Sequence, residues 1–434
     1  MTAQRYFELS ALWRAGSDDV AEISLRLGEQ TLSRIADTEK HTVRDYFRAS
    51  ATTLGLWFVD NWWRLRWETL SDSRFASVDW RLRHELNSAA GGALWPPVMI
   101  YSAADRIVFA PSFGKSTVAG PQQYFESKVA MVMANEYEAE LDGFLDVVAR
   151  HCARSEDGKA LETILRQIRA ERADPELAGW RRLEACLGYD ADQAPNAVID
   201  ALIELEEVAG EDGVEEAARA QPGLASATVL TESIEATRVS KVEVNLDLAA
   251  QIERDPTLPP SASPWRFAAG AASDLRRIIG VRHGPLSHQE FSGIFQARWA
   301  DLRTATATAR SLPYGARLGD DSGNARLSLQ TLLSHDRRFE LARTLGDAIW
   351  QGAESFGVVS RAKTDRQKFQ RAFAHDLLCP FDDLSRILDV NAPTQDAIDS
   401  AARTFLVHSS VVRNQLVYKG YLPFENPGEE ADAA

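Results

Sequence analysis

Two stretches in the last third of the chain decide how that part folds: RRFELARTLGD at residues 337–347 and FQRAFAHDLLCP at residues 369–380. In each, apolar residues return every three or four positions, which is the spacing of an amphipathic helix. The pattern predicts helices over 337–351 and 365–378, the second ended by Pro380, because proline cannot continue a helix. The segment NARLSL at 324–329 predicts a strand before the first helix.

This strand and the two helices resemble the ImmA/IrrE family of small zinc-dependent endopeptidases. In that family the first helix has the form RRFTLAHELGH, which contains the zinc motif HExxH, and the second has the form EAxxFAxxLLMP. The likeness covers residues 264–390, extends at most to 422, and involves nothing before 255. It implies a zincin-like fold for this part and a role in prokaryotic stress-response, mobile-element or phage-related regulation, commonly through action on a repressor.

The groups that carry zinc chemistry in the family are replaced here. HExxH works because two histidines on one helix face supply nitrogen ligands, while the glutamate activates the zinc-bound water. This chain has RTLGD at 343–347, so the three positions hold Arg343, Thr344 and Asp347, and the third ligand falls in QKFQ at 367–370, where we assign Gln370. Arginine stays protonated and repels a dication, and threonine cannot act as general base.

We therefore expect no catalytic residue, no metal and no cofactor in this domain. Arg343 and Asp347 stand at i and i+4, and we expect a helix-surface ion pair between them in the space of the metal. Four other residues could rebuild a metal site but lack a recognised ligand spacing, namely His335, His375, Asp376 and His408. We expect these to be surface or helix-end residues. His84-Glu85 is followed by Ser88 rather than by a histidine at i+4, and Gly114-Lys115-Ser116 lacks the phosphate-loop frame.

Length and composition indicate a soluble globular protein of several domains. The 434 residues correspond to two to four domains, and 45% apolar with 26% charged residues excludes disorder as the main description. No apolar run is long enough for a membrane span, and the N-terminus has no apolar core typical of a secretory signal. The three cysteines are far apart and form no CxxC, which fits a reducing cytoplasm, our expected location.

The negative charge is concentrated in the middle of the chain. The net charge is −15, residues 1–125 hold 14 basic and 14 acidic side chains, and residues 126–256 hold 13 basic and 29 acidic. This balance argues against nucleic acid as a direct ligand. An acidic helix face is usually solvated surface, but it could also dock a basic partner. The candidate partner face comprises Glu204, Glu206 and Glu207.

We expect an α+β protein that is predominantly helical. The predicted parts are a mixed α/β, Trp-rich domain at 1–120, an acidic helical region at 121–254, a Pro-rich linker at 255–264, an ImmA/IrrE-like pseudo-peptidase domain at 265–390, a helix-turn-helix-like extension at 391–426 and a disordered tail at 427–434. Helices are predicted over 122–152 and 286–297, among others, and a hairpin over 22–35.

The N-terminal third concentrates aromatic and basic residues. Its candidate ligand or partner pocket comprises Trp57, Trp62, Trp63, Arg64, Arg66, Trp67, Trp80, His84 and Trp95. At helical spacing such tryptophans most often build a core or a domain interface. The alternative is that they line an aromatic pocket that binds a planar ligand or a side chain of a partner.

Three functions remain open from the sequence. The first is a non-catalytic pseudo-peptidase that acts as a regulatory, sensor or scaffold protein through a protein partner, which may be co-encoded. The second is a ligand sensor or enzyme with its site in the Trp-rich N-terminal domain. The third is a DNA-binding regulator that uses the C-terminal extension, although Arg413 and Lys419 alone are few for phosphate neutralisation. The sequence leaves the oligomeric state open.

Overall fold

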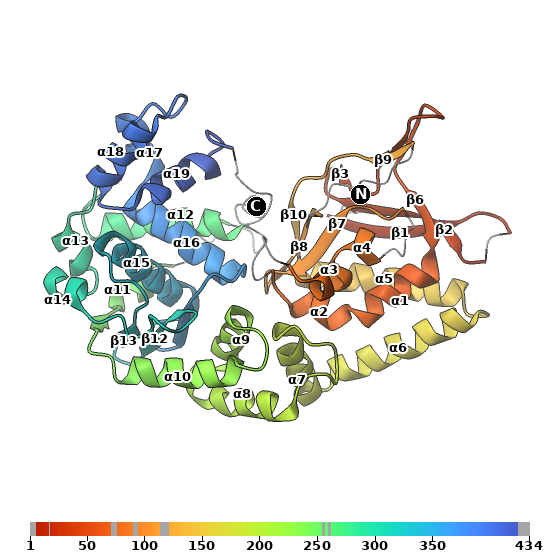
Figure 1. Ribbon diagram of the computed structural model, residues 1–434, viewed down its shortest axis with the longest axis horizontal. Helices are drawn as coiled ribbons and strands as arrows, with labels where there is room; N and C mark the ends of the chain where they lie inside the picture. The colour runs from red at the N-terminus through yellow and green to blue at the C-terminus, as the bar shows by residue number, and fades with distance from the viewer. Residues whose placement is uncertain are drawn as a thin grey trace. The chain divides into compact units, whose positions relative to one another are not determined.

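The computed structural model describes residues 6–16, 18–70, 76–89, 94–112, 121–253, 257–258 and 262–423. It confirms the predicted class: the protein is α+β, with helix predominating over several small antiparallel sheets (Figure 1). The chain divides into two compact units, one up to Ala194 and the other from Pro195 onward. The predicted tail at 427–434, Gly114-Lys115-Ser116 and half of the predicted linker lie outside the described residues.

The N-terminal unit holds three antiparallel sheets, ordered β1-β2-β3 with β6 also on β2, β10-β8-β7, and β5-β4-β9. Its strands are β1 (Phe7–Trp13), β2 (Val20–Leu27), β3 (Gln30–Thr31), β4 (Ile35–Asp37), β5 (Thr42–Arg44), β6 (Phe47–Ser50), β7 (Val98–Ser102), β8 (Arg106–Pro111), β9 (Gln122–Tyr124) and β10 (Ala130–Met133). Its helices are α1 (Ala51–Asp60), α2 (Trp62–Trp67), α3 (Val78–His84), α4 (Leu86–Ala89), α5 (Ala134–His151), α6 (Glu156–Ala173) and α7 (Pro175–Cys186).

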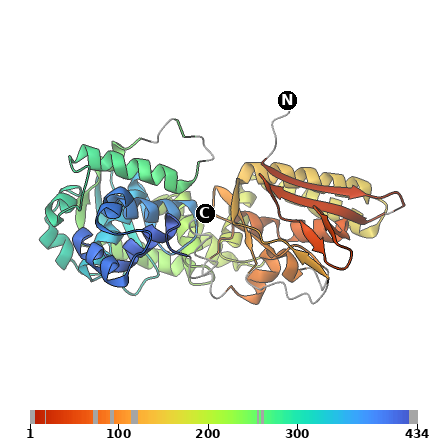
Figure 2. The same cartoon turned by 90° about the horizontal axis from the view of Figure 1, so that it is seen from above.

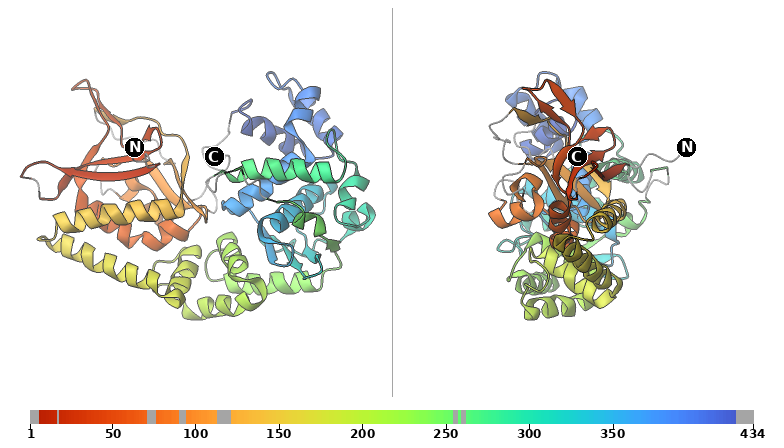
Figure 3. Two further views of the ribbon diagram at one scale, coloured as in Figure 1. Left: turned by 180° about the vertical axis from the view of Figure 1, so that it is seen from behind. Right: turned by 90° about the vertical axis from the view of Figure 1, so that its right-hand side faces the viewer.

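The core of this unit lies between the first sheet and the helices. The alternation along β2 turns Ile23, Leu25 and Leu27 inward, where they are buried with Leu141 and Leu145 of α5. Helix α5 runs along β1 (Figure 2), and α6 lies beside α5 (Figure 3). The hairpin predicted near residue 22 is present as β2 and β3.

The prediction of one helix over 122–152 is wrong in its first third. Residues 122–124 form β9, which pairs with β4, and 130–133 form β10, which pairs with β8. Helix α5 begins only at Ala134. Strand pairing with residues far away in the sequence overrides the local helical spacing here, as tertiary context often does.

The C-terminal unit is built on one antiparallel sheet ordered β11-β13-β12-β14. The strands are β11 (Glu243–Asn245), β12 (Gly315–Gly319), β13 (Asn324–Ser328) and β14 (Phe356–Val359). The helices are α8 (Asn196–Ala209), α9 (Glu211–Ala220), α10 (Ser226–Arg238), α11 (Asp247–Ala250), α12 (Pro264–Ile278), α13 (His288–Gly293), α14 (Trp299–Thr304), α15 (Ser334–Gln351), α16 (Asp365–Leu378), α17 (Phe381–Ile387), α18 (Gln395–Phe405) and α19 (Ser409–Tyr418). The helix predicted over 286–297 is thus shorter than expected.

Helix α16 is the centre of this unit. It packs against both α12 and α15, and its residues Phe369, Phe373 and Leu377 are fully buried. Helices α8 to α10 belong to the same unit because α10 packs on β12 and β13 and α9 on β14. For this reason the chain divides at Ala194 and Pro195, inside the region predicted as one acidic helical part, and not at the predicted linker 255–264.

Candidate functional site

Helix α15 carries the segment that resembles HExxH, and two buried arginines fix the start of this helix. Arg337 and Arg338 are fully buried and donate to backbone carbonyls: Arg337 Nη1 to Leu302 O and Ala305 O at 3.0 and 2.9 Å, and Arg338 Nη2 to Leu286 O at 2.9 Å. Burial lowers the pKa of Arg338 to about 10, because it has no carboxylate partner to offset desolvation. These two residues therefore tie α15 to the chain around α13 and α14.

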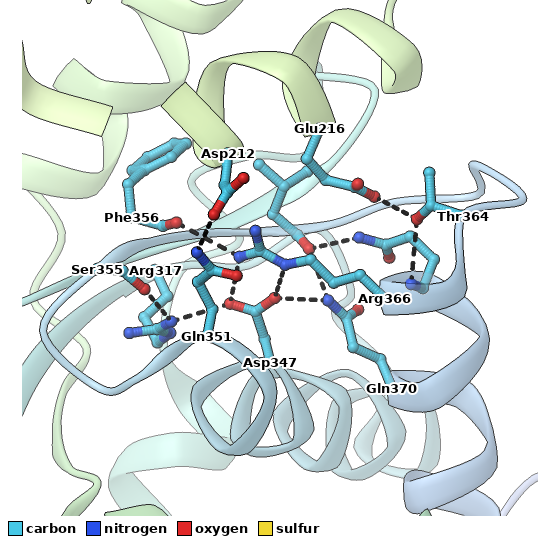
Figure 4. A network of polar contacts seen from close by, with 12 residues as sticks. Asp212, Glu216, Arg317, Asp347, Gln351, Ser355, Phe356, Thr364, Arg366 and Gln370 are labelled. Carbon is cyan, nitrogen blue, oxygen red and sulfur yellow. Dashed lines mark hydrogen bonds and ion pairs between the residues drawn. The ribbon is translucent and has the colours of Figure 1, made fainter. Parts of the chain in front are cut away.

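Asp347, at the second histidine position, is the centre of a buried charge cluster (Figure 4). Its carboxylate accepts from Arg317 Nη2 of β12 at 2.9 Å and from Arg366 Nε and Nη2 of α16 at 2.7 and 3.0 Å. Gln370 Nε2 donates a further bond at 2.7 Å. Burial alone raises the pKa of Asp347, but Arg366 and Arg317 outweigh it and hold this pKa below its ordinary value.

The expected ion pair between Arg343 and Asp347 is wrong. Arg343 is half-buried and uses Nη2 to donate to Ser360 O and Gln367 Oε1, both at 2.6 Å, and to Gln370 Oε1 at 3.3 Å. Asp347 is fully buried and is already paired with arginines from two other elements. The i and i+4 spacing places both residues on one helix face, but stronger partners are available to each across the fold.

Gln370 links the two motif positions. Its amide accepts from Arg343 and donates to Asp347 and to Val358 O of β14, the last at 2.9 Å. Within the segment 367–370 it is the residue that contacts both Arg343 and Asp347. Thr344, at the glutamate position, is buried and donates to Glu340 O of its own helix at 3.0 Å. The structure thus brings Arg343, Asp347 and Gln370 together and leaves Thr344 in a helical backbone contact.

Helix α9 adds two carboxylates to the rim of this cluster (Figure 4). Glu216 is buried and accepts from Thr364 Oγ1 at 2.8 Å, and Asp212 accepts from Gln351 at the end of α15. The Thr364 hydroxyl also caps α16 by accepting from Gln367 N at 3.2 Å. Hydrogen bonds therefore run from Glu216 through Thr364 and Gln367 to Arg343.

Four members of this polar network are not predicted from the sequence, namely Arg317, Arg366, Thr364 and Glu216. The sequence contains a signal for Thr364 and for Arg366. Thr364 and Gln367 have the spacing of a capping box, and Arg366 stands four residues before Gln370 on one helix face. Arg317 and Glu216 come from β12 and α9, and no local spacing connects them to the motif.

These groups do not fit a zinc ion. Each carboxylate oxygen of Asp347 already accepts from arginine, and Arg343 brings a positive charge to the place of a neutral ligand. Within the described part of the chain, no group of three or more His, Cys, Asp and Glu side chains is arranged to hold a metal. The arrangement supports neither metal ligation nor activation of a water molecule.

The four residues considered for a rebuilt site serve separate roles. His375 is buried between Phe339 and Tyr418, and burial lowers its pKa to about 3. Asp376 accepts from Gln415 of α19 at 2.9 Å, and burial raises its pKa. His335 is exposed in the first turn of α15, and His408 caps α19. Because Gln415 also donates to Cys379 O, the helix-turn-helix-like segment is bonded to α16.

The Trp-rich cluster of the N-terminal unit lies mainly in the interior. Trp62, Trp63, Trp80 and Trp95 are buried, while Trp57 and Trp67 are half-buried. Trp57 Nε1 donates to Leu82 O, and Trp63 Nε1 donates to Glu171 Oε2 at 2.9 Å. This is the placement of core tryptophans.

The basic residues of this cluster are bound to acids of the same unit. Arg64 pairs with Glu68 at 2.6 Å and with Asp79 at 2.7 Å, and His84 Nε2 lies 2.9 Å from Glu68. Burial raises the pKa of Glu68, but His84 and Arg64 bring it below its ordinary value. Arg66 pairs with Glu138 and lies 3.8 Å above the Trp67 ring. These contacts make the predicted pocket residues a connected structural network.

The candidate partner face lies on α8. Glu204 and Glu207 are exposed and Glu206 is half-buried, while Ile199 and Leu202 turn into the unit. Glu204 and Glu207 are therefore accessible to solvent, and their role as a partner face stays a prediction.

This chain matches no protein-family model, no curated protein and no solved structure. Among its described helices, none is both long and apolar enough to cross a membrane.

Proposed function

We propose that this protein is a non-catalytic pseudo-peptidase, a regulatory or scaffold protein that acts through a protein partner. The resemblance to the ImmA/IrrE family suggests a prokaryotic stress-response, mobile-element or anti-phage system. The observation that supports the proposal is the hydrogen-bonded network of Arg343, Gln370 and Asp347, the three residues that the resemblance assigns to the zinc-ligand positions.

The energetics of this network support a structural role. A carboxylate held by two buried arginines is strongly coupled to its partners, and removing one member leaves uncompensated charge in the interior. A metal would have to displace both arginines from Asp347. The tryptophan cluster lies mainly in the interior of the N-terminal unit. This position favours a structural role for the cluster over a ligand site.

Metal analysis and a rebuilt motif test the proposal together. The purified protein should contain no stoichiometric zinc and should not cleave a co-encoded protein. The combined substitution Arg343→His, Thr344→Glu, Asp347→His and Gln370→Glu restores the ligand set of the resembled family, and Arg317→Met and Arg366→Met are added because Asp347 no longer neutralises these two buried cations. We expect it to bind one zinc ion per chain, measured by elemental analysis after dialysis against zinc.

A matched control carries Thr344→Glu alone and should remain metal-free. Stoichiometric zinc with proteolysis in the unmodified protein would refute the proposal. A rebuilt variant that folds but takes up no zinc would remove the support drawn from the family resemblance.

A further inference from the structure

A cluster of positive charge lies next to the degenerate motif. Residues 361–371, RAKTDRQKFQR, hold five basic side chains and one acidic one, in a chain whose net charge is −15. This segment comprises the loop after β14 and the first half of α16. Arg366 is buried and neutralised by Asp347, and Lys368 is also buried, so the basic side chains with solvent exposure are Arg361, Lys363 and Arg371.

Two guanidinium groups converge on the loop at 360–364. Arg343 of α15 donates to Ser360 O at 2.6 Å, and Arg371 of α16 donates to Ala362 O at 3.2 Å. Arg361 lies between these two carbonyls in the chain, and its side chain is exposed. Arg343 and Arg371 are both half-buried, so they remain open to solvent on one side.

Arg343 contacts only neutral oxygens directly, although the carboxylates of Glu340, Asp347 and Glu216 lie near enough to act on its charge. Its three acceptors are neutral oxygens and all of them contact Nη2, while Nε is buried without an acceptor. No carboxylate within the described part of the chain forms an ion pair with it. The nearby Glu340 is engaged elsewhere, since it accepts from the backbone of Gln330 and Thr331. Such a charge costs stability unless a ligand compensates it.

We propose that Arg343, Arg371 and Arg361 form a binding site for a carboxylate of an acidic protein segment. This inference rests on the proposed function and specifies what the partner presents to the degenerate centre. A carboxylate is favoured because a buried arginine of α16, Arg366, already pairs with a carboxylate, that of Asp347, at 2.7 Å. Guanidinium groups bind carboxylate and phosphate with similar geometry, so the test must separate the two.

Calorimetric titration of the full chain with an octapeptide of glutamate tests the site. Inorganic phosphate at matched ionic strength is the second probe. The substitution Arg343→Gln should weaken peptide binding by about tenfold or more, because it removes a partly desolvated charge. Arg361→Gln should weaken binding by only about two- to fivefold, since exposed charges are screened. Arg282→Gln, which changes an exposed arginine elsewhere in the same unit, should leave affinity unchanged.

Three results would overturn the carboxylate site: no binding of the peptide, binding that persists in Arg343→Gln, or binding of phosphate alone. If Arg343→Gln fails to fold, the comparison of Arg361→Gln with Arg282→Gln decides, and equal affinities in those two variants would also contradict the site. None of these results changes the zinc content expected for the purified protein. The carboxylate site and the proposed function can therefore be refuted separately.

Discussion

Asp347 shows at the scale of one residue how the charges of the degenerate centre depend on each other. Its carboxylate contacts both Arg317 and Arg366, and all three side chains are buried. The substitution Asp347→Asn keeps the shape of the side chain but leaves the two buried cations, Arg317 and Arg366, without their anion. We expect a loss of about 3–5 kcal/mol in the free energy of unfolding, measured by denaturant titration.

The control is Asp301→Asn. Asp301 pairs with Arg298 on the surface, where both side chains are exposed, so this change should cost less than about 1 kcal/mol. Equal effects of the two substitutions would show that the buried cluster is energetically no different from a surface pair.

His375 makes the stability of the C-terminal unit depend on pH. Its pKa is about 3 in the folded chain and near 6.5 when exposed, because burial disfavours the charged form and Arg371 adds repulsion. Below pH 6.5 the unfolded chain binds a proton that the folded chain excludes. Stability should therefore fall as the pH decreases from about 6.5 to about 3, by at most about 1.4 kcal/mol per pH unit.

The substitution His375→Gln should flatten this part of the pH profile, measured by denaturant titration at several pH values. His335→Gln is the matched control, because His335 is exposed. A profile with the same slope in His375→Gln as in the unmodified protein would assign the acid sensitivity to other groups.

The sequence predicts which residues belong to the site, but it does not predict which side chains they contact. The motif positions Arg343, Asp347 and Gln370 were identified by comparison with a family pattern, and the structure brings them into one network. Their ion pairing was predicted wrongly because helical spacing reports only neighbours on the same helix. The partners of Asp347 lie 30 residues before it and 19 after it, and only the packing of β12 and α16 on α15 brings them near.

At the scale of elements, Thr364 joins the cap of α16 to helix α9. Its hydroxyl accepts from Gln367 N and donates to Glu216 Oε1. Thr364→Ala removes the cap and also leaves a buried carboxylate without its donor. We expect a loss of about 2–3 kcal/mol in stability, measured by denaturant titration.

Thr364→Ser retains the hydroxyl and should recover more than half of that loss. If serine is as destabilising as alanine, the packing of the threonine methyl group carries the effect and the hydrogen bonds do not.

Long helices were the most predictable elements, and short strands the least. The helices α15 and α16 lie within three residues of their predicted bounds, because each has a periodic apolar face. Strands β9 and β10 were predicted as helix. Three or four residues carry little periodicity, and β9 exists because it pairs with β4, more than 80 residues earlier.

At the scale of the molecule, the acidity of the middle region is shared between the two units. Residues 126–194 hold 9 basic and 15 acidic side chains, and residues 195–256 hold 4 and 14. Many acids of the first group are paired, such as Glu138 and Asp142 with Arg172. The excess of negative charge therefore belongs mainly to helices α8 to α11 of the C-terminal unit.

Reversal of charge on α8 tests whether this excess guides a basic partner. The combined change of Glu204, Glu206 and Glu207 to lysine should weaken association and reduce its salt dependence, while thermal stability stays nearly unchanged. Glu232→Lys, on the exposed side of α10, is a control for charge alone. Association that is unaffected at low and at high salt would make the α8 face solvated surface only.

The two units should also unfold as separate cooperative blocks, because each has its own core. The buried cluster of the first unit runs from Phe7 to Ala185, that of the second from Val242 to Leu416, and they share no residue. Each unit also has its own buried arginine network: Arg181 with Glu171 and Glu184 in the first, and Asp347 with its arginines in the second. Calorimetry of the full chain should therefore show two transitions, with Arg181→Met lowering the midpoint of one and Asp347→Asn that of the other. If both substitutions shift a single shared transition, the units fold as one cooperative block, and a change at the degenerate centre would then be transmitted to the N-terminal unit.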